Sequence, residues 1–260
     1  IYPISDQSVT QAPQLLRSES LAAVVYRMLR EQARNVPEYR LGQHLGPQGA
    51  LFMGTDYVIP GFYTQQGYQQ YFSVQGSMLV TAILRDNWVL GEGSGISGMD
   101  LRRLMVELEK LYFRDYANYW SEAVGNVTLP PFNDFGEGAE QLAGLTSANS
   151  PILQLLVEVR ENTRFPVPAD DSSEAAGTLA EKGGKAGKLA SEVADKVAGA
   201  LAKKLPDTAK KSLQRRFEPL HRLLDDNNGP AADLTLALNA LNDLQLQMAS
   251  LARASAPEQA

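Results

Sequence analysis

The run GSGISG at residues 93–98 matches the pattern G-x-G-x-x-G, which holds a pyrophosphate in dinucleotide-binding proteins. Such a site also needs a strand before the loop and a second strand after the helix that follows it. Here the helix expected after the glycines runs on through residue 124, and a proline-rich loop comes next. The context favours an ordinary glycine-rich loop, and we expect no cofactor.

A second run, GEGSG at residues 91–95, resembles the nucleophile elbow of serine hydrolases, but that motif requires glycine where Glu92 stands. The chain has two histidines, His44 and His221, and no cysteine. The two histidines fit none of the usual zinc-ligand spacings. The lack of cysteine excludes thiolate sites and disulfides. We therefore expect both histidines to be surface or packing residues, and we expect no bound metal.

Pairs of carboxylates hydrolyse glycosidic bonds, and one predicted helix carries four acidic residues. Three of them are expected on its polar side, namely Glu107, Glu109 and Glu122. The fourth, Asp115, lies on or beside the buried stripe, where a carboxylate needs a polar partner. We predict that Asp115 accepts from a backbone N–H or pairs with one of three arginines, Arg85, Arg160 or Arg164. A catalytic acid is the alternative.

Charge and hydropathy argue against a nucleic-acid partner and against a segment that spans a membrane. The 24 lysines and arginines are outnumbered by 30 aspartates and glutamates, which gives a formal net charge of −6. Duplex-binding proteins usually carry a basic face, so nucleic acid is not an expected partner. The longest apolar run, LAAVVY at residues 21–26, is too short to cross a bilayer. Because the chain starts at Ile1, we expect it to be a piece of a longer or processed protein.

The elements that must position these groups are helices. Hydrophobic periodicity predicts them at residues 18–34, 99–125, 136–147, 150–163 and 212–226, with one more after the break NNGP at 227–230. The pattern over 77–90 fits either a helix or a strand, and we favour the helix. The predicted fold is therefore all-α, a multi-helix domain with long loops. A short β element near residues 50–60 stays open as an addition to it.

Two of these helices carry more specific predictions. The helix over 18–34 is expected to bury a stripe of Leu21, Val24, Val25, Met28 and Leu29. The helix over 150–163 is expected to start with Ser150 as its N-cap and Pro151 at its first position. Its outward residues are expected to be Glu158, Arg160 and Glu161.

Composition divides the chain into three parts. Residues 1–165 form an aromatic-rich helical domain, and only Phe217 among the aromatic residues lies beyond them. Residues 166–207 are rich in alanine, glycine and lysine and are expected to be a flexible insertion or linker. Residues 208–260 are expected to form a helical hairpin that leads toward a C-terminal domain outside this chain.

The stretch IPGFYTQQGYQQYF at residues 59–72 could be a ligand-binding surface or the start of a buried helix. Thr64 is a suitable N-cap, which puts Tyr63 and Tyr68 at the positions of a hydrophobic staple. Gly67 is expected to admit a neighbouring backbone. We predict that the rings of this stretch are buried.

Four blocks, in this order, carry a family resemblance: PGFYTQQGYQQYF (60–72), RDNWVLG (85–91), LEKLYFRDYANYWSEAVGNV (108–127) and SPILQLLVEVRENT (150–163). Together they resemble the IcmF-related family, also called TssM. The residues that carry the resemblance, and that we take as its structural signature, are Phe62, Thr64, Tyr68, Phe72, Trp88, Tyr112, Asp115, Tyr116 and Trp120.

The resemblance implies a place in the cell envelope. Family members are inner-membrane proteins of bacterial type VI secretion systems, and these blocks belong to the helical part of their periplasmic region. Members assemble with themselves, with an inner-membrane protein (TssL) and with an outer-membrane lipoprotein (TssJ). The lipoprotein binds a β-rich C-terminal domain, which we expect to lie outside this chain.

The sequence therefore predicts a structural scaffold of a trans-envelope complex, and not an enzyme. The alternative is a periplasmic helical domain that binds or hydrolyses glycans, and a cytosolic interaction module is third. Exposure distinguishes the first two, because a binding site would expose several aromatic rings together with an acid. A scaffold would bury the rings.

Overall fold

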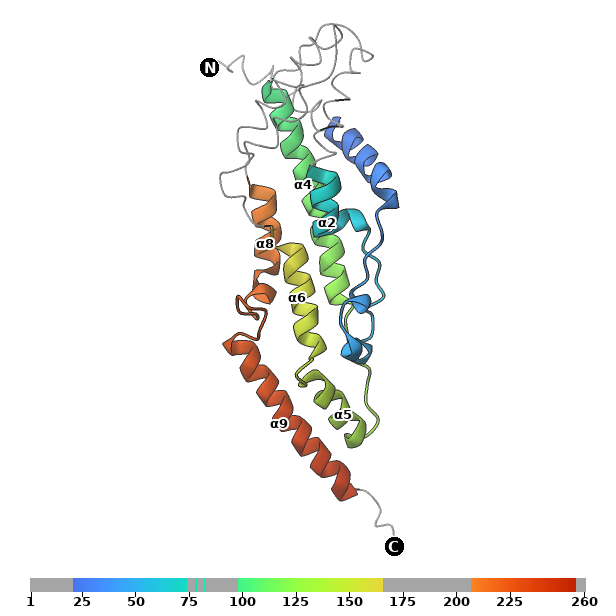
Figure 1. Cartoon of the computed structure of the whole chain (residues 1–260), viewed down its shortest axis with the longest axis vertical. Coiled ribbons are helices and arrows are strands. Elements are labelled where there is room, and N and C mark those ends of the chain that lie inside the picture. Colours follow the sequence, from blue (N-terminus) through green and yellow to red (C-terminus); the bar gives the residue numbers. More distant parts are fainter. Residues whose placement is uncertain (1–20, 74–77, 79–81, 83–97, 166–206, 256–260) are drawn as a thin grey trace, which may run out of the picture. The chain divides into compact units, whose positions relative to one another are not determined.

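The computed structural model describes residues 21–73, 78, 82, 98–165 and 207–255, and its regular structure is helical (Figure 1). Within these ranges there is no strand, and β pairing is confined to three isolated bridges: Tyr39 with Ile59, Met53 with Thr128, and Leu224 with Pro230. The predicted all-α class is confirmed. The β element expected near 50–60 amounts to the single bridged residues Met53 and Ile59.

Several sequence predictions fall on residues outside the described ranges. They include Trp88, Arg85 and almost all of the predicted helix over 77–90, the glycine-rich runs between 91 and 97, and the predicted insertion up to residue 206.

The chain forms two compact units, each assembled from three stretches of sequence. Unit 1 contains residues 1–37, 61–116 and 165–211, and unit 2 contains residues 38–60, 117–164 and 212–260. Helices α4 (Gly98–Gly125) and α8 (Thr208–His221) each contribute residues to both units. The three-part division by composition remains a prediction.

In unit 1, a helix over residues 21–32 is followed by the turn η1 (Ala33–Asn35). Its inward side chains are Ala22, Val25, Tyr26 and Leu29. The prediction that Val24 and Met28 are buried is wrong, because both are exposed. The helix is rotated so that the ring of Tyr26, which the aliphatic stripe left out, reaches the interior.

Three short elements follow in unit 1: η4 (Gly61–Tyr63), α2 (Gln65–Gly67) and the π turn η5 (Tyr68–Phe72). Thr64 is the N-cap of α2, since its Oγ1 accepts from the Gly67 N–H at 3.0 Å. The same hydroxyl donates to the Gly61 carbonyl at 2.8 Å. A Cβ on Gly67 would stand 2.1 Å from the Gly61 carbonyl oxygen. The glycine therefore permits a close backbone approach, as expected.

The helices of unit 2 include α5 (Phe135–Leu145), α6 (Pro151–Thr163) and α9 (Ala232–Ser255), with the short turns η2 (Leu41–Gln43) and η3 (Pro47–Leu51). Ser150 caps α6 by accepting from the Ile152 N–H at 3.2 Å, and Pro151 occupies the first position, which confirms both predictions.

Helix α9 packs along α5 (Figure 1). At Gly138 of α5 the side chain of Met248 comes close, since a Cβ there would stand 2.2 Å from Met248 Cε. A separate core cluster of Leu156, Leu224 and Leu234 joins α6 to the start of α9. None of the described helices is long and apolar enough to cross a membrane.

Candidate functional site

The interior of unit 1 is an aromatic cluster, which we define as Tyr26, Phe62, Tyr63, Tyr68, Phe72, Tyr112, Phe113, Tyr116 and Phe165. Tyr112 is at its centre and is 0% exposed. Its ring stacks on Phe72 at 4.0 Å between centroids and meets Phe62 edge-on at 4.9 Å. Such arrangements add about 0.5–1.5 kcal/mol per pair to the hydrophobic gain of burial. The cluster is thus a packed core.

The predicted staple of Tyr63 on Tyr68 takes an indirect form within this cluster. Each ring contacts Tyr112, at centroid distances of 5.5 and 6.0 Å. The hydroxyl of Tyr112 donates to the Phe62 carbonyl at 2.6 Å. One buried tyrosine therefore joins α4 to the whole stretch over 61–72.

Asp115 lies at the edge of the aromatic cluster, and both of its oxygens have partners. Tyr26 donates its hydroxyl proton to Oδ2 at 2.6 Å, and Arg114 donates to Oδ1 at 3.0 Å. Because Tyr26 has only one proton to give, Tyr63 must donate to the Tyr26 oxygen, 2.5 Å away. Burial, then Tyr63 and Asp115, raise the pKa of Tyr26 far above its ordinary value.

This arrangement corrects the predicted partner of Asp115. The ion pair is made with its neighbour Arg114, and Arg160 donates to other groups. The sequence does not predict a tyrosine hydroxyl as this partner, because nothing in it links Tyr26 to residue 115. With its lone pairs accepting from Tyr26 and Arg114, Asp115 is held as a structural carboxylate.

Glu109 was expected on the polar side of its helix, and this prediction is wrong because the residue is only 8% exposed. Burial raises the pKa of Glu109, Lys210 at the start of α8 opposes that rise, and Asp207 adds to it. The Lys210 ammonium also lies over the Tyr68 ring, 5.1 Å from its centroid. The first turn of α8 therefore covers Glu109 with a compensating charge.

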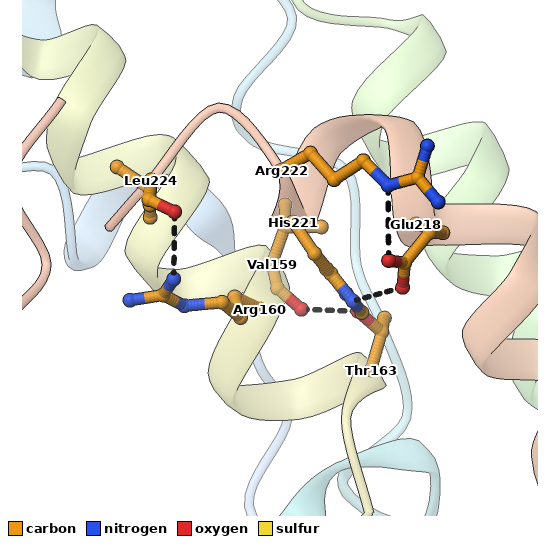
Figure 2. A network of polar contacts seen from close by, with 7 residues as sticks. All are labelled: Val159, Arg160, Thr163, Glu218, His221, Arg222 and Leu224. Carbon is orange, nitrogen blue, oxygen red and sulfur yellow. Dashed lines mark hydrogen bonds and ion pairs between the residues drawn. The ribbon is translucent and has the colours of Figure 1, made fainter. Parts of the chain in front are cut away.

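Unit 2 contains a second organised group, which we call the polar joint: Arg160 and Thr163 of α6, His221 of α8, and the loop over 222–231 (Figure 2). Arg160 is 4% exposed. It donates through Nη1 to the carbonyls of Asp225 at 2.9 Å and Leu224 at 3.4 Å, and through Nη2 to Asn228 Oδ1. The prediction that Arg160 points outward is wrong.

His221 lies in the same joint and is 7% exposed. Its Nε2 is 2.6 Å from Thr163 Oγ1, and the Thr163 hydroxyl donates to the Val159 carbonyl at 2.6 Å (Figure 2). Burial lowers the pKa of His221, as do Arg164 and Arg160, while Glu218 acts in the opposite sense. This histidine is therefore a buried packing residue, as the sequence indicated.

The loop of the polar joint is also fixed from within. Asp225 Oδ1 accepts from the N–H groups of Asn227 at 2.9 Å and Gly229 at 2.8 Å. The Ala231 N–H donates to the Leu223 carbonyl at 2.9 Å, immediately before α9 begins. These bonds, together with those from Arg160, fix the path of the loop that connects α8 to α9.

Comparison with known sequences gives the chain a family. The profile described as IcmF-related, "Intracellular multiplication and human macrophage-killing", matches residues 1–164. The chain belongs to the IcmF-related family. The chain is also similar to the "Type VI secretion system component TssM1" of Pseudomonas aeruginosa, at 25% identity over 257 residues. The match covers 92% of this chain but only 23% of that protein. No solved structure matches.

The structure divides the residues chosen as the family's signature between its two units. Those in unit 1 are Phe62, Thr64, Tyr68, Phe72, Tyr112, Asp115 and Tyr116. Trp120 is fully buried in unit 2, where it packs against Tyr39 at 5.2 Å between ring centroids. The ring of His44 also stacks on Tyr39, with 4.4 Å between the ring centroids. Of the described signature rings, Phe62, Phe72, Tyr112, Tyr116 and Trp120 are buried.

Among its described residues this IcmF-related chain has no group of three or more potential metal ligands. The residues that sequence reasoning missed are Glu109, Arg160 and the Thr163–His221 pair. A signal for Arg160 did exist. Leu156, Val159, Arg160 and Thr163 follow the i, i+3, i+4, i+7 spacing of one helix face, so strict periodicity would have placed the arginine inside.

Proposed function

We propose that this chain is a structural, non-enzymatic part of a type VI secretion component and serves as a scaffold in a trans-envelope membrane complex. Membership of the IcmF-related family and the likeness to a protein named as such a component support this. The single observation that carries the structural role is the burial of the aromatic signature. Phe62, Tyr112 and Trp120 are all interior side chains.

The proposed mechanism is mechanical. Close-packed interiors deform little, so a helical domain with such a core can transmit position between the neighbours it contacts. The aromatic cluster stiffens unit 1, and the polar joint sets the course of the chain from α8 into α9 in unit 2. Neither role requires a bound cofactor or a reacting group.

Exposed apolar side chains support protein–protein contact as the mode of action. In unit 2 the exposed apolar side chains include Leu236, Leu246 and Leu251 of α9, with Phe132 and Phe135 near the start of α5. Apolar side chains gathered on one element are typical of contact surfaces. We propose that neighbouring subunits of the envelope complex cover them.

The partners and the compartment are part of the same proposal. The chain would be a periplasmic portion of an inner-membrane-anchored protein that assembles with copies of itself and with a TssL-like inner-membrane protein. A TssJ-like lipoprotein would join through a domain outside this chain.

The glycan-binding or glycan-hydrolysing alternative receives no comparable support. It requires aromatic rings exposed beside an acid. The described rings of the signature are mostly buried, and Asp115 is engaged by Tyr26 and Arg114.

Affinity purification of the full-length parent from cell envelopes tests the scaffold directly. We expect other secretion-system subunits to be recovered with the wild-type protein. A parent with Leu236→Ser and Leu251→Ser on α9 should recover fewer of them. The matched control is Val24→Ser with Met28→Ser, which also makes exposed apolar residues polar, but in unit 1. If the wild-type parent recovers no such subunit, the assignment is wrong.

An activity assay tests the non-enzymatic part of the proposal. The purified chain is incubated with peptidoglycan, and soluble products are followed by mass spectrometry for the wild type and Asp115→Asn. We expect neither protein to release any product. Products that appear with the wild type and vanish with Asp115→Asn would establish the catalytic alternative.

A further inference from the structure

Exposed apolar side chains lie where the start of α5 meets the C-terminal half of α9 (Figure 1). Phe132, Phe135 and Leu251, which we call the apolar patch, are 50, 46 and 50% exposed. We propose that the apolar patch is the docking surface for a protein segment that presents apolar side chains flanked by lysine or arginine. This inference rests on the scaffold role proposed above, since it names the chemistry of one neighbour.

The apolar patch is one surface, although it draws on two helices of unit 2. A Cβ on Gly138 of α5 would stand 2.2 Å from Met248 Cε and 3.1 Å from the Phe132 ring, so Phe132 lies beside α9. Leu251 follows Met248 by three residues, which makes the two side chains neighbours on α9. Phe135 is the first residue of α5. A partner that covers Phe132 therefore meets the other two side chains as well.

Hydrogen bonds hold the backbone that carries the two phenylalanines. Asp134 Oδ1 accepts from the Glu137 N–H at 2.8 Å, and Glu137 Oε2 accepts from the Asn133 N–H at 2.8 Å. Before the phenylalanines, Gln141 donates through Nε2 to the Pro130 carbonyl at 3.1 Å. A surface that is already ordered loses little conformational entropy when a partner binds it. The apolar patch is thus pre-organised for docking.

The charges at the start of α5 are negative. Asp134, Glu137 and Glu140 are exposed and lie next to the two phenylalanines in sequence. In the part of the chain that the structure describes, none of these three carboxylates forms an ion pair. The last turn of α9 contributes one cation, Arg253. Because complementary charge steers association and selects the partner, the apolar patch favours a partner of net positive charge.

Two other occupants fit the apolar patch less well. In a symmetric pair of chains the apolar patch would meet itself, so that carboxylates would face carboxylates. An anionic lipid surface would repel the same carboxylates. The formal net charge of −6 on the whole chain acts in the same sense. A basic protein segment is therefore favoured over a second copy of this chain and over a membrane.

Site-specific photo-cross-linking in cells tests the docking surface in the full-length parent. Benzoyl-phenylalanine is placed at position 132 and, as a control for random collision, at the exposed Asn242 of α9. Mass spectrometry of the cross-linked peptides then identifies the captured segment. We expect position 132 to capture a protein segment that carries several apolar residues and more lysine and arginine than aspartate and glutamate. Position 242 should not capture it.

Two charge variants show whether the carboxylates select the partner. Glu137→Gln with Glu140→Gln removes two charges but keeps the acceptor for the Asn133 N–H, so the cross-linking yield at position 132 should fall by roughly twofold or more. The matched control is Asp226→Asn with Asp243→Asn, which removes the same charge at other exposed positions of unit 2. This control should keep the wild-type yield. Both variants should keep the wild-type melting temperature.

The docking proposal is overturned if position 132 captures no more than position 242, or captures only a second copy of this chain, only lipid, or a segment without an excess of basic residues. It is also overturned if the two charge variants give equal yields. Any of these results leaves the scaffold role standing, provided that affinity purification recovers other secretion-system subunits. If position 132 captures a basic segment and purification recovers no such subunit, the docking surface stands and the scaffold assignment fails.

Discussion

The aromatic cluster of unit 1 and the polar joint of unit 2 organise two interiors by different physics. In the cluster, rings from three stretches of sequence pack around Tyr112, and most of the stabilisation comes from area removed from water. In the joint, hydrogen bonds of fixed direction hold the parts together: Arg160 donates to the loop, and His221 of α8 bonds to Thr163 of α6. The stability of the aromatic cluster depends on the volume and shape of its rings. The stability of the polar joint depends on individual hydrogen-bond donors and acceptors.

In the scaffold that we propose, this difference gives the two interiors different roles. Aromatic packing resists deformation at any pH, because no buried ring of the cluster ionises near neutrality and burial raises the pKa of Tyr112 and Tyr116 well above the usual range. The polar joint depends instead on hydrogen bonds from Arg160 and His221. We therefore expect substitutions in the aromatic cluster to disrupt the fold of unit 1. Substitutions in the polar joint should loosen only the loop over 222–231.

The largest effect should come from Tyr112→Ala. It removes the central ring of the aromatic cluster and its bond to the Phe62 carbonyl, at a cost of about 3–5 kcal/mol in unfolding free energy. Denaturant unfolding measures this cost. Tyr112→Phe keeps the ring and should cost only about 1 kcal/mol. Equal costs for the two variants would mean that the hydroxyl, and not the packing, holds the cluster.

Arg160→Met should come next, with a cost of about 2–4 kcal/mol, because the acceptors at residues 224, 225 and 228 lose the charged donor that the buried Arg160 supplies. Hydrogen exchange should show the loss in the loop over 222–231. The control is Arg164→Met, the same change at an exposed position of the same segment, which should cost under about 0.5 kcal/mol. If the two variants are alike, the joint has no special role.

Gly67→Ala should be destabilising by about 1–3 kcal/mol, because its Cβ would meet the carbonyl oxygens of Gly61 at 2.1 Å and Phe62 at 2.7 Å. Gly125→Ala is the matched control at the end of α4, where a Cβ meets nothing within 4 Å. That change should be neutral or slightly stabilising. Thermal unfolding of the two variants measures whether the close backbone approach at Gly67 makes unit 1 intolerant of a Cβ there.

The smallest effect should come from Asp115→Asn, which weakens the bond from Tyr26 and the pair with Arg114. We expect a lower melting temperature, corresponding to about 1–2 kcal/mol. The cost should shrink in a Tyr26→Phe background, since the two residues share one bond. An unchanged melting temperature would mean that Asp115 has no structural role.

Much of the fold follows from the sequence where local rules decide it. Ser150 and Pro151 specify the start of α6. The apolar residues Leu104, Leu108 and Tyr112, spaced four apart, specify α4. Both signals are readable because caps and periodicity act within a few residues. The burial of Phe62 and Phe72 was also predictable, since Thr64 fixes the face on which the later ring lies.

The polar interior was not predictable, because its partners are distant in sequence. Arg160 was assigned to the surface on its charge, although its spacing from Leu156 put it inside, and its acceptors are backbone carbonyls that no residue type announces. Glu109 is buried because Lys210 lies near it in the fold. Periodicity gives the face of a helix but does not identify the segment that will cover that face.

Hydroxyl-radical footprinting of the folded chain, read by mass spectrometry, tests most directly the claim that the aromatic signature serves an interior. After correction for intrinsic reactivity, Tyr112 and Trp120 should be labelled at least roughly tenfold more slowly than the exposed Phe132 and Phe135. Under denaturing conditions the four residues should become alike. If Tyr112 and Trp120 react in the folded chain as fast as Phe132 and Phe135, the rings form an exposed binding surface and the scaffold account is wrong.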